Sequence, residues 1–134
     1  MIMDNNLVLS DEQALTVTAV STYSVDMGAA RLIGAGKQMY VVIVIDVLCA
    51  TMTSINFQVV TDTEETLASP TVQIETGAIA RTSLTAGRTP IVIPLGSAIG
   101  TQERYLGLQY TVVTTGTCTV TAFIGFDYQS NYGD

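Results

Sequence analysis

The chain has 134 residues, a length that fits one domain and leaves no room for a second core of normal size. Apolar residues make up 48% and charged residues only 13%, a composition that excludes long-range disorder and indicates that a partner covers part of the surface. The net charge of −7 argues against nucleic acid and anionic membranes as ligands, and the absence of histidine excludes His-based triads and His metal sites.

Short β-like runs separated by turn residues follow one another from the N-terminus. Residues 7–9 predict a short first segment, and the polar residues 11–13 predict a single turn after it. Residues 14–20 alternate between apolar and polar side chains, which predicts a half-exposed strand. Residues 21–27 predict a second short strand, and the glycine-containing residues 28–37 predict a loop.

The middle of the chain holds the strongest strand signal. Residues 39–48 are nearly all apolar and mostly β-branched, which predicts a central strand buried on both faces. Residues 54–61 alternate, so Ile55, Phe57 and Val59 are expected on a core face. The acidic residues 62–69 then predict an exposed turn, and a further strand is expected to contain Val72, Ile74 and Ile79.

The C-terminal third predicts three more strands. Pro90 and Pro94 bracket a short run and place it at a sheet edge, because proline cannot donate a ladder hydrogen bond. Residues 104–114 and 117–126 predict two long strands that pair as a hairpin around Thr115-Gly116. The sequence therefore predicts an all-β, single-domain jelly-roll sandwich of eight to nine antiparallel strands over residues 1–134, with an immunoglobulin-like sandwich as the second choice.

Candidate chemical sites have simpler structural explanations. Residues 28–36 are rich in glycine but lack the Lys-Ser/Thr pair, the ordered G-x-G-x-x-G and the following helix of a phosphate-binding loop. Asp62, Glu64 and Glu65 could act as paired carboxylates or bind Ca²⁺, yet a solvated loop explains them without further assumption. We therefore expect no enzymatic activity, no catalytic residue, no metal site and no cofactor.

Cys49 and Cys118 each lie in a predicted strand. Two cysteines do not make a disulfide framework, and we expect two unbridged, buried thiols in a reducing cytoplasm. A bridge would need adjacent strands with Cα atoms about 5.5 Å apart. Asp4 stands where a signal peptide needs basic residues, and the apolar run 39–47 is shorter than a spanning helix, so we expect neither an export signal nor a membrane span.

Six stretches in a fixed order resemble one protein family. They are NNLVLSDEQALT at residues 5–16, residues 21–28 ending in VDMG, GAGKQMYVV at 34–42, SINFQVVTD at 54–62, GRTPIVIPL at 87–95, and RYLGLQY at 104–110. In this order they resemble the capsid cement (decoration) proteins of tailed bacteriophages, a small jelly-roll family first noted in a Bordetella phage. The turn within residues 110–118 is shorter than in those relatives, so contacts made by that turn transfer least.

The resemblance implies a non-enzymatic virion protein on the capsid exterior, made in the host bacterial cytoplasm. It implies binding to a shell of HK97-like major capsid proteins and clamping of neighbouring capsomers. A second copy is the other expected partner, with a homodimer favoured over a trimer because strand edges are abundant. Many copies, each with a modest interface, would stabilise such a shell through multivalency.

The terminal segments 1–9 and 127–134 are predicted to be interaction arms. Apolar side chains near the N-terminus can add a strand or fill a groove, and tyrosines in the C-terminal segment can anchor an interface. Alternatively, residues 7–9 are simply the first jelly-roll strand. The candidate capsid or self contacts are Ile2, Leu7, Val8, Leu9, Ile91, Ile93, Tyr128 and Tyr132.

Two rival functions come from other classes. A carbohydrate- or receptor-binding β-sandwich of a phage would need exposed aromatic side chains gathered on one face; the chain has six tyrosines but no tryptophan. A jelly-roll enzyme of the cupin type would need histidine ligands, and the chain has none. Both rivals therefore rank below the cement protein.

Overall fold

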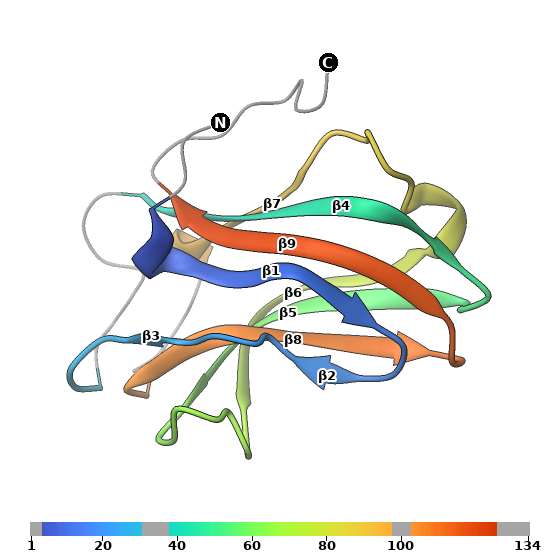
Figure 1. Cartoon of the computed structure of the whole chain (residues 1–134). Coiled ribbons are helices and arrows are strands. Elements are labelled where there is room, and N and C mark those ends of the chain that lie inside the picture. The colour runs from blue at the N-terminus through green and yellow to red at the C-terminus, as the bar shows by residue number, and fades with distance from the viewer. Residues whose placement is uncertain (1–3, 31–37, 98–102, 126–134) are drawn as a thin grey trace.

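The computed structural model describes residues 4–30, 38–97 and 103–125, where nine strands form two antiparallel sheets packed face to face (Figure 1). The four-stranded sheet has the order β1 (Val8–Leu15), β9 (Thr117–Gly125), β4 (Tyr40–Ala50), β7 (Ile91–Pro94). The five-stranded sheet has the order β2 (Ala19–Val20), β8 (Tyr105–Val113), β5 (Ser54–Asp62), β6 (Thr71–Ala80), and β3 (Val25–Asp26) also pairs with β8. Because β2 and β3 share one position beside β8, the arrangement has four positions in each sheet, which confirms the predicted jelly roll.

Single turns of 3-10 helix precede or follow some of these strands. They are η1 (Asn5–Leu7), η2 (Arg81–Ser83) and η3 (Leu95–Ser97). Among the described residues, no helix is long and apolar enough to cross a membrane.

Strand β4 is the central strand that the sequence predicts. It pairs with β9 on one side and with β7 on the other. Val41, Ile43 and Ile45 pack in the core between the sheets, whereas Val42 and Val44 form a second buried cluster with Phe123 on the opposite face. Burial on both faces explains the continuous run of β-branched residues from Val41 to Ile45. The prediction is wrong for the end of the run, because Val47 and Leu48 are exposed.

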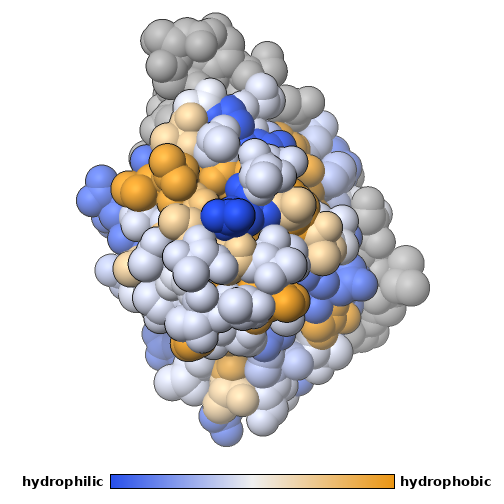
Figure 2. All heavy atoms as spheres, turned by 90° about the vertical axis from the view of Figure 1, so that its right-hand side faces the viewer, coloured by the Kyte–Doolittle hydropathy of each residue, from blue (hydrophilic) through white to orange (hydrophobic). Residues whose placement is uncertain are grey.

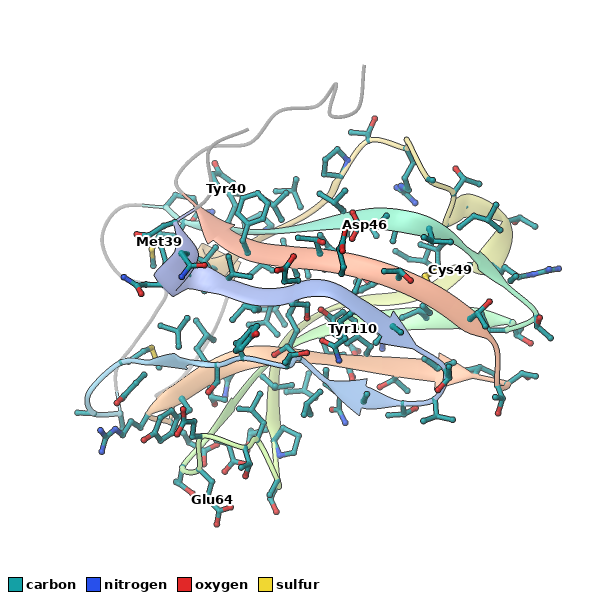
Figure 3. All side chains as sticks on the ribbon, in the orientation of Figure 1. Met39, Tyr40, Asp46, Cys49, Glu64 and Tyr110 are labelled. Carbon is teal, nitrogen blue, oxygen red and sulfur yellow. A yellow bond between two sulfur atoms is a disulfide. The ribbon has the colours of Figure 1, made fainter. Side chains whose placement is uncertain are left out.

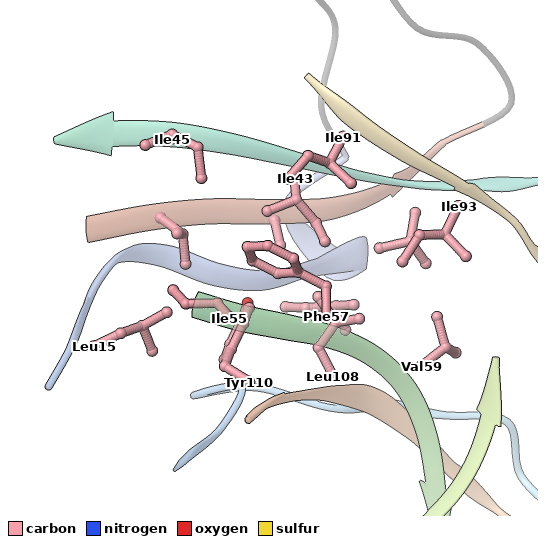
Figure 4. Packing of buried hydrophobic residues seen from close by; sticks show 14 of the residues in the cluster. Leu15, Ile43, Ile45, Ile55, Phe57, Val59, Ile91, Ile93, Leu108 and Tyr110 are labelled. Carbon is pink, nitrogen blue, oxygen red and sulfur yellow. The ribbon is translucent and has the colours of Figure 1, made fainter. Parts of the chain in front are cut away.

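The core between the sheets is built around two aromatic side chains (Figure 4). The rings of Phe57 and Tyr110 meet edge to face with centroids 5.8 Å apart, and both side chains are fully buried. The Tyr110 hydroxyl lies 2.7 Å from Ser10 Oγ. Ser10 donates its own hydroxyl hydrogen to Gln13, so Tyr110 is the donor to Ser10, and the buried polar group is satisfied. Burial raises the pKa of Tyr110, which stays neutral at physiological pH.

The N-terminal strands differ from the prediction. Residues 11–13 do not form a turn between two segments; they are a bulged part of β1, where Glu12 has a φ of 46° and the pairing with β9 shifts register twice. Residues 14–20 are not one strand either, because β1 ends at Leu15 and β2 begins at Ala19 in the other sheet. Apolar and polar side chains alternate without interruption from residue 15 to residue 19. The alternation therefore does not show where the chain leaves the first sheet.

The last two long strands do not form the predicted hairpin. β8 and β9 follow each other closely, yet they belong to opposite sheets. The backbone of the connection is satisfied by neighbouring segments: Thr53 N donates to Val113 O at 2.9 Å, and Gly116 N donates to Thr16 O at 3.1 Å. A two-residue turn signal predicts pairing between the strands it joins, but here both strands bury their apolar faces against each other across the core.

The expectation of two unbridged thiols is wrong, because Cys49 and Cys118 form a disulfide. Cys49 lies in β4 and Cys118 in the adjacent strand β9, and their Cα atoms are 4.2 Å apart. The register that places them side by side is set by β9 pairing with β4 rather than with β8. Spacing along the sequence could not show this, since 69 positions separate the two residues.

We predict that Gly116→Ala destabilises the protein by about 1–3 kcal/mol, the usual cost of overpacking a tight site. A Cβ atom at this position would overlap the backbone of Ala50 and Met52. The matched control is Thr115→Ala at the exposed neighbouring position, which should change the free energy of unfolding by less than about 0.5 kcal/mol. Urea unfolding measures both; equal stability of the two variants would contradict the close packing of this turn.

Candidate functional site

The two ends of the sandwich differ in charge. At one end, the β5–β6 loop carries Glu64 and Glu65, and Asp62, Asp26 and Glu103 lie close to the same end. At the other end lie the β1–β2, β4–β5, β6–β7 and β8–β9 connections, in which residues 16–18, 51–53, 81–90 and 114–116 include no acidic residue. Figure 3 shows Glu64 and Cys49 near these opposite ends. The negative charge is therefore concentrated away from one group of loops.

Asp62 organises the acidic loop and is not a solvated residue. Its side chain is 3% exposed and accepts hydrogen bonds from the backbone N–H groups of Ser69, Thr63 and Glu64. These bonds, that of Ser69 first, lower the pKa of Asp62. Its carboxylate is thus occupied by the loop backbone, which explains the acid at this position without a bound metal or a catalytic role.

An ion pair joins β3 to β8 at the same end. Arg104 donates from Nε and Nη2 to the two carboxylate oxygens of Asp26, at 2.7 and 2.9 Å. Gly28 N also donates to Asp26 at 2.8 Å. The hydrogen bond from Arg104, followed by that from Gly28, lowers the pKa of Asp26 to about 2. The register of β3 on β8 pairs Asp26 with Tyr105 and so brings Asp26 beside Arg104.

Glu75 accepts hydrogen bonds from side chains of its own sheet. One of its oxygens accepts hydrogen bonds from Asn56 Nδ2 and Gln58 Nε2, each at 3.0 Å, and these bonds lower its pKa. No group of three or more metal-ligating side chains occurs among residues 4–30, 38–97 and 103–125.

The outer strands of both sheets are poor templates for adding a partner strand. β7 has four residues, with Pro90 before it and Pro94 at its end, which confirms the predicted edge position. β2 and β3 have two residues each. β1 and β6 are longer, but register shifts interrupt the pairing of each with its neighbour. Short, proline-bounded or bulged edges hinder edge-to-edge association, so contacts with partners are better sought at the ends and faces.

The predicted contact residues fall into three groups. Ile2, Tyr128 and Tyr132 lie outside the described residues. The side chains of Leu9, Ile91 and Ile93 are buried in the core, so a partner could reach only their backbone. Leu7 is partly buried against the same core, and Val8 packs against the second cluster on the other face of β1. Residues 8 and 9 therefore form the start of the first jelly-roll strand.

A recess of about 500 Å³ lies beside η1 and the first strands. Its lining residues are Asn5, Asn6, Val8, Asp11, Tyr23, Ser24 and Thr121. Among the described lining residues Tyr23 is the one aromatic side chain, and it is exposed, whereas a sugar-binding face would be expected to gather several aromatic side chains. The recess gives the carbohydrate-binding alternative a location but little further support.

Comparison with known families decides between these possibilities. The family model of Bbp16 matches residues 9–126, which run from the second residue of β1 to the residue after β9. The chain belongs to the Bbp16 family. Bbp16 is a capsid cement protein of a Bordetella phage, so the family places this chain among structural proteins of the phage capsid. A search of the curated proteins finds no match.

The family assignment agrees with the resemblance noted in the sequence, but no pattern in the sequence distinguishes the acid-free loops as a contact surface. Their residues lie in four separate places along the chain and carry no motif. The signal available was negative: each of the four connections lacks aspartate and glutamate in a chain of net charge −7. Only the jelly-roll topology shows that the four lie together.

We predict that Asp26 titrates near pH 2 and that Arg104→Gln returns its pKa toward 3.8. A carboxyl group whose pKa is lower in the folded state stabilises the fold above its unfolded pKa, and this contribution is lost as the pH falls from about 4 to below 2. NMR titration of the aspartate carboxyl carbons measures the shift. Asp62 serves as the control, because its pKa is lowered by backbone groups and should not respond to Arg104→Gln; an unchanged Asp26 would contradict the ion pair.

Proposed function

We propose that this protein binds the outside of an icosahedral shell of HK97-like major capsid proteins and stabilises the shell by bridging neighbouring capsomers. The observation that carries the proposal is the Bbp16 family match over nearly the whole jelly roll. The composition supports it, since a chain with only 13% charged residues leaves much weakly charged surface to be covered by a partner.

Bridging requires a rigid body with at least two separate contact surfaces. The sandwich provides rigidity through its continuous core and the disulfide between β4 and β9. β4 has 11 residues, so the sandwich is about 35 Å long at the usual rise of a strand. A shell held at many such sites gains stability by mass action, because the protein binds only the assembled lattice.

We predict that the purified protein co-sediments with empty shells of the major capsid protein from the same phage and raises the temperature at which they come apart. Saturable binding to shells, with no binding to unassembled capsid protein, is the expected pattern. Differential scanning calorimetry of bare and decorated shells measures the gain. A chain that fails to sediment with shells but gives clear hits on a glycan array would reverse the choice of function.

We also propose that the terminal segments 1–6 and 127–134 are anchors to the shell. The first strand begins at Val8 and the last ends at Gly125, and both of these positions lie at the end opposite the acid-free loops. Apolar Ile2 and the tyrosines Tyr128 and Tyr132 are the residue types that anchor interfaces.

Deleting residues 1–6 or 128–134 should leave a folded domain, because all nine strands remain. Each deletion should weaken binding to purified shells by about tenfold or more, equivalent to about 1.4 kcal/mol per site. Circular dichroism melting confirms that the truncated chains fold, and co-sedimentation measures their affinity. Two truncated forms that decorate shells as tightly as the full chain would show that the anchors lie elsewhere.

The homodimer stays a prediction. The bulged and short sheet edges offer few backbone groups for pairing, so we propose that two copies meet through side chains or through their terminal segments rather than through a shared sheet. High local concentration on a shell would favour such pairing even where the free protein is monomeric.

A further inference from the structure

The acid-free loops and the strand residues next to them form one surface, which we call the threonine-rich end: residues 16–18, 47–53, 80–89 and 113–117. Ten of its residues are threonine, two are arginine, and none is acidic. The carboxylate nearest to it along the chain is Asp46, whose Oδ2 accepts a hydrogen bond from Thr121. In a chain with 12 acidic residues, this end is therefore neutral to weakly basic.

Exposed apolar side chains are concentrated at the same end. Of the six large apolar residues that are most exposed in the described part of the chain, four belong to it: Val17, Val47, Leu48 and Val113, each between 48% and 56% exposed. Figure 2 looks onto this end and shows apolar patches among weakly polar surface, with strongly hydrophilic residues in only a few places. Depletion of charge together with exposed apolar side chains is characteristic of the centre of a protein interface.

The loops of this end are fixed to one another before any partner arrives. Gly116 N donates to Thr16 O, Thr53 N donates to Val113 O, and Arg81 N donates to Thr53 O, at 2.9–3.1 Å. The hydroxyl groups of Thr53 and Thr114 lie 3.1 Å apart. The disulfide of Cys49 and Cys118 lies directly behind this surface. A surface that is already rigid loses little conformational entropy on binding, which favours affinity.

Two arginines at this end favour a partner surface that carries carboxylates. In the described part of the chain the one ion pair is that of Arg104 with Asp26, so Arg81 and Arg88 have no acidic partner there. Arg88 donates to the carbonyl groups of Ser83 and Thr89, and Arg81 is exposed. A partner surface with carboxylates opposite these two guanidinium groups would be complementary to them.

We propose that the threonine-rich end docks on the outer surface of the major capsid protein shell, on a weakly polar patch that carries carboxylates. This inference rests on the proposed function and adds the contact surface to it. β1 begins and β9 ends at the opposite end of the sandwich, a domain length away from this surface. One copy then has a contact at each end, which is what bridging two capsomers requires.

The test compares exposed apolar positions at the two ends. Val17→Glu and Leu48→Glu each place a negative charge on the threonine-rich end, whereas Val72→Glu makes the matched change on β6 at the other end, where Val72 is 42% exposed. The probe is co-sedimentation with empty shells of the major capsid protein from the same phage. We expect Val17→Glu and Leu48→Glu to weaken binding by tenfold or more and Val72→Glu by less than twofold, with all three chains melting within a few degrees of the wild type.

The possible outcomes separate the two proposals. Wild-type protein that binds shells, together with Val17→Glu and Leu48→Glu variants that bind equally well, would overturn the docking surface and leave the proposed function standing. Equal losses in all three variants would also overturn it, because the effect would then follow charge and not position. If the two variants bind shells normally but change the oligomeric state in sedimentation velocity, the end is a contact between copies. Wild-type protein that does not bind shells would contradict both proposals.

Discussion

The connection between β8 and β9 is the constraint on which the rest of the structure depends. Residues 114–116 carry the chain from one sheet to the other, and both strands that they join are interior strands. β9 is the partner of β1 and also of β4, while β8 is the partner of β2, β3 and β5. Neither sheet is continuous until residues 105–125 are in place. The tight contact of Gly116 with the β4–β5 turn is therefore made where both sheets are completed.

The same crossing gives the molecule its two unlike ends. It brings the β8–β9 connection beside the β1–β2 and β4–β5 connections, which are far apart in the sequence, and binds all three through backbone hydrogen bonds. At the other end, carboxylates are used to hold the loops, with Asp62 accepting backbone N–H groups and Asp26 paired with Arg104. A capsid cement protein needs surfaces that hold a partner and surfaces that remain solvated, and we propose that the separation of charge along the sandwich supplies both.

Those parts of the fold could be predicted from the sequence in which a residue type is typical of a single environment. The β-branched run in β4 reports burial on both faces, and the prolines around β7 report an edge. The pairing partners could not be predicted in the same way. A short turn after Val113 indicates a hairpin, yet the apolar faces of β8 and β9 are better buried across the core than side by side. The disulfide could not be predicted for the same reason, because Cys49 and Cys118 become neighbours only through that topology.

For the candidate contact surface, too, one part could be predicted from the sequence and another part is visible only in the structure. Family resemblance in the sequence identified the class of protein, and the family match confirms it. Leu9, in the apolar N-terminal segment, and Ile91 and Ile93, in a predicted edge strand, were expected as contacts, but their side chains fill the core. The absence of acids from four scattered connections has meaning only after the fold has gathered them at one end.

A reconstruction of the decorated particle by electron cryo-microscopy tests the central claim most directly, since it shows both where the protein sits and how it is oriented. The account predicts one jelly roll at each site on the outside of the shell, with the β1–β2, β4–β5 and β8–β9 connections against one capsomer and the terminal segments reaching its neighbour. Glu64 and Glu65 should face solvent. Density in which the threonine-rich end points away from every capsid subunit, or a shell that carries no jelly roll on its exterior, would contradict it.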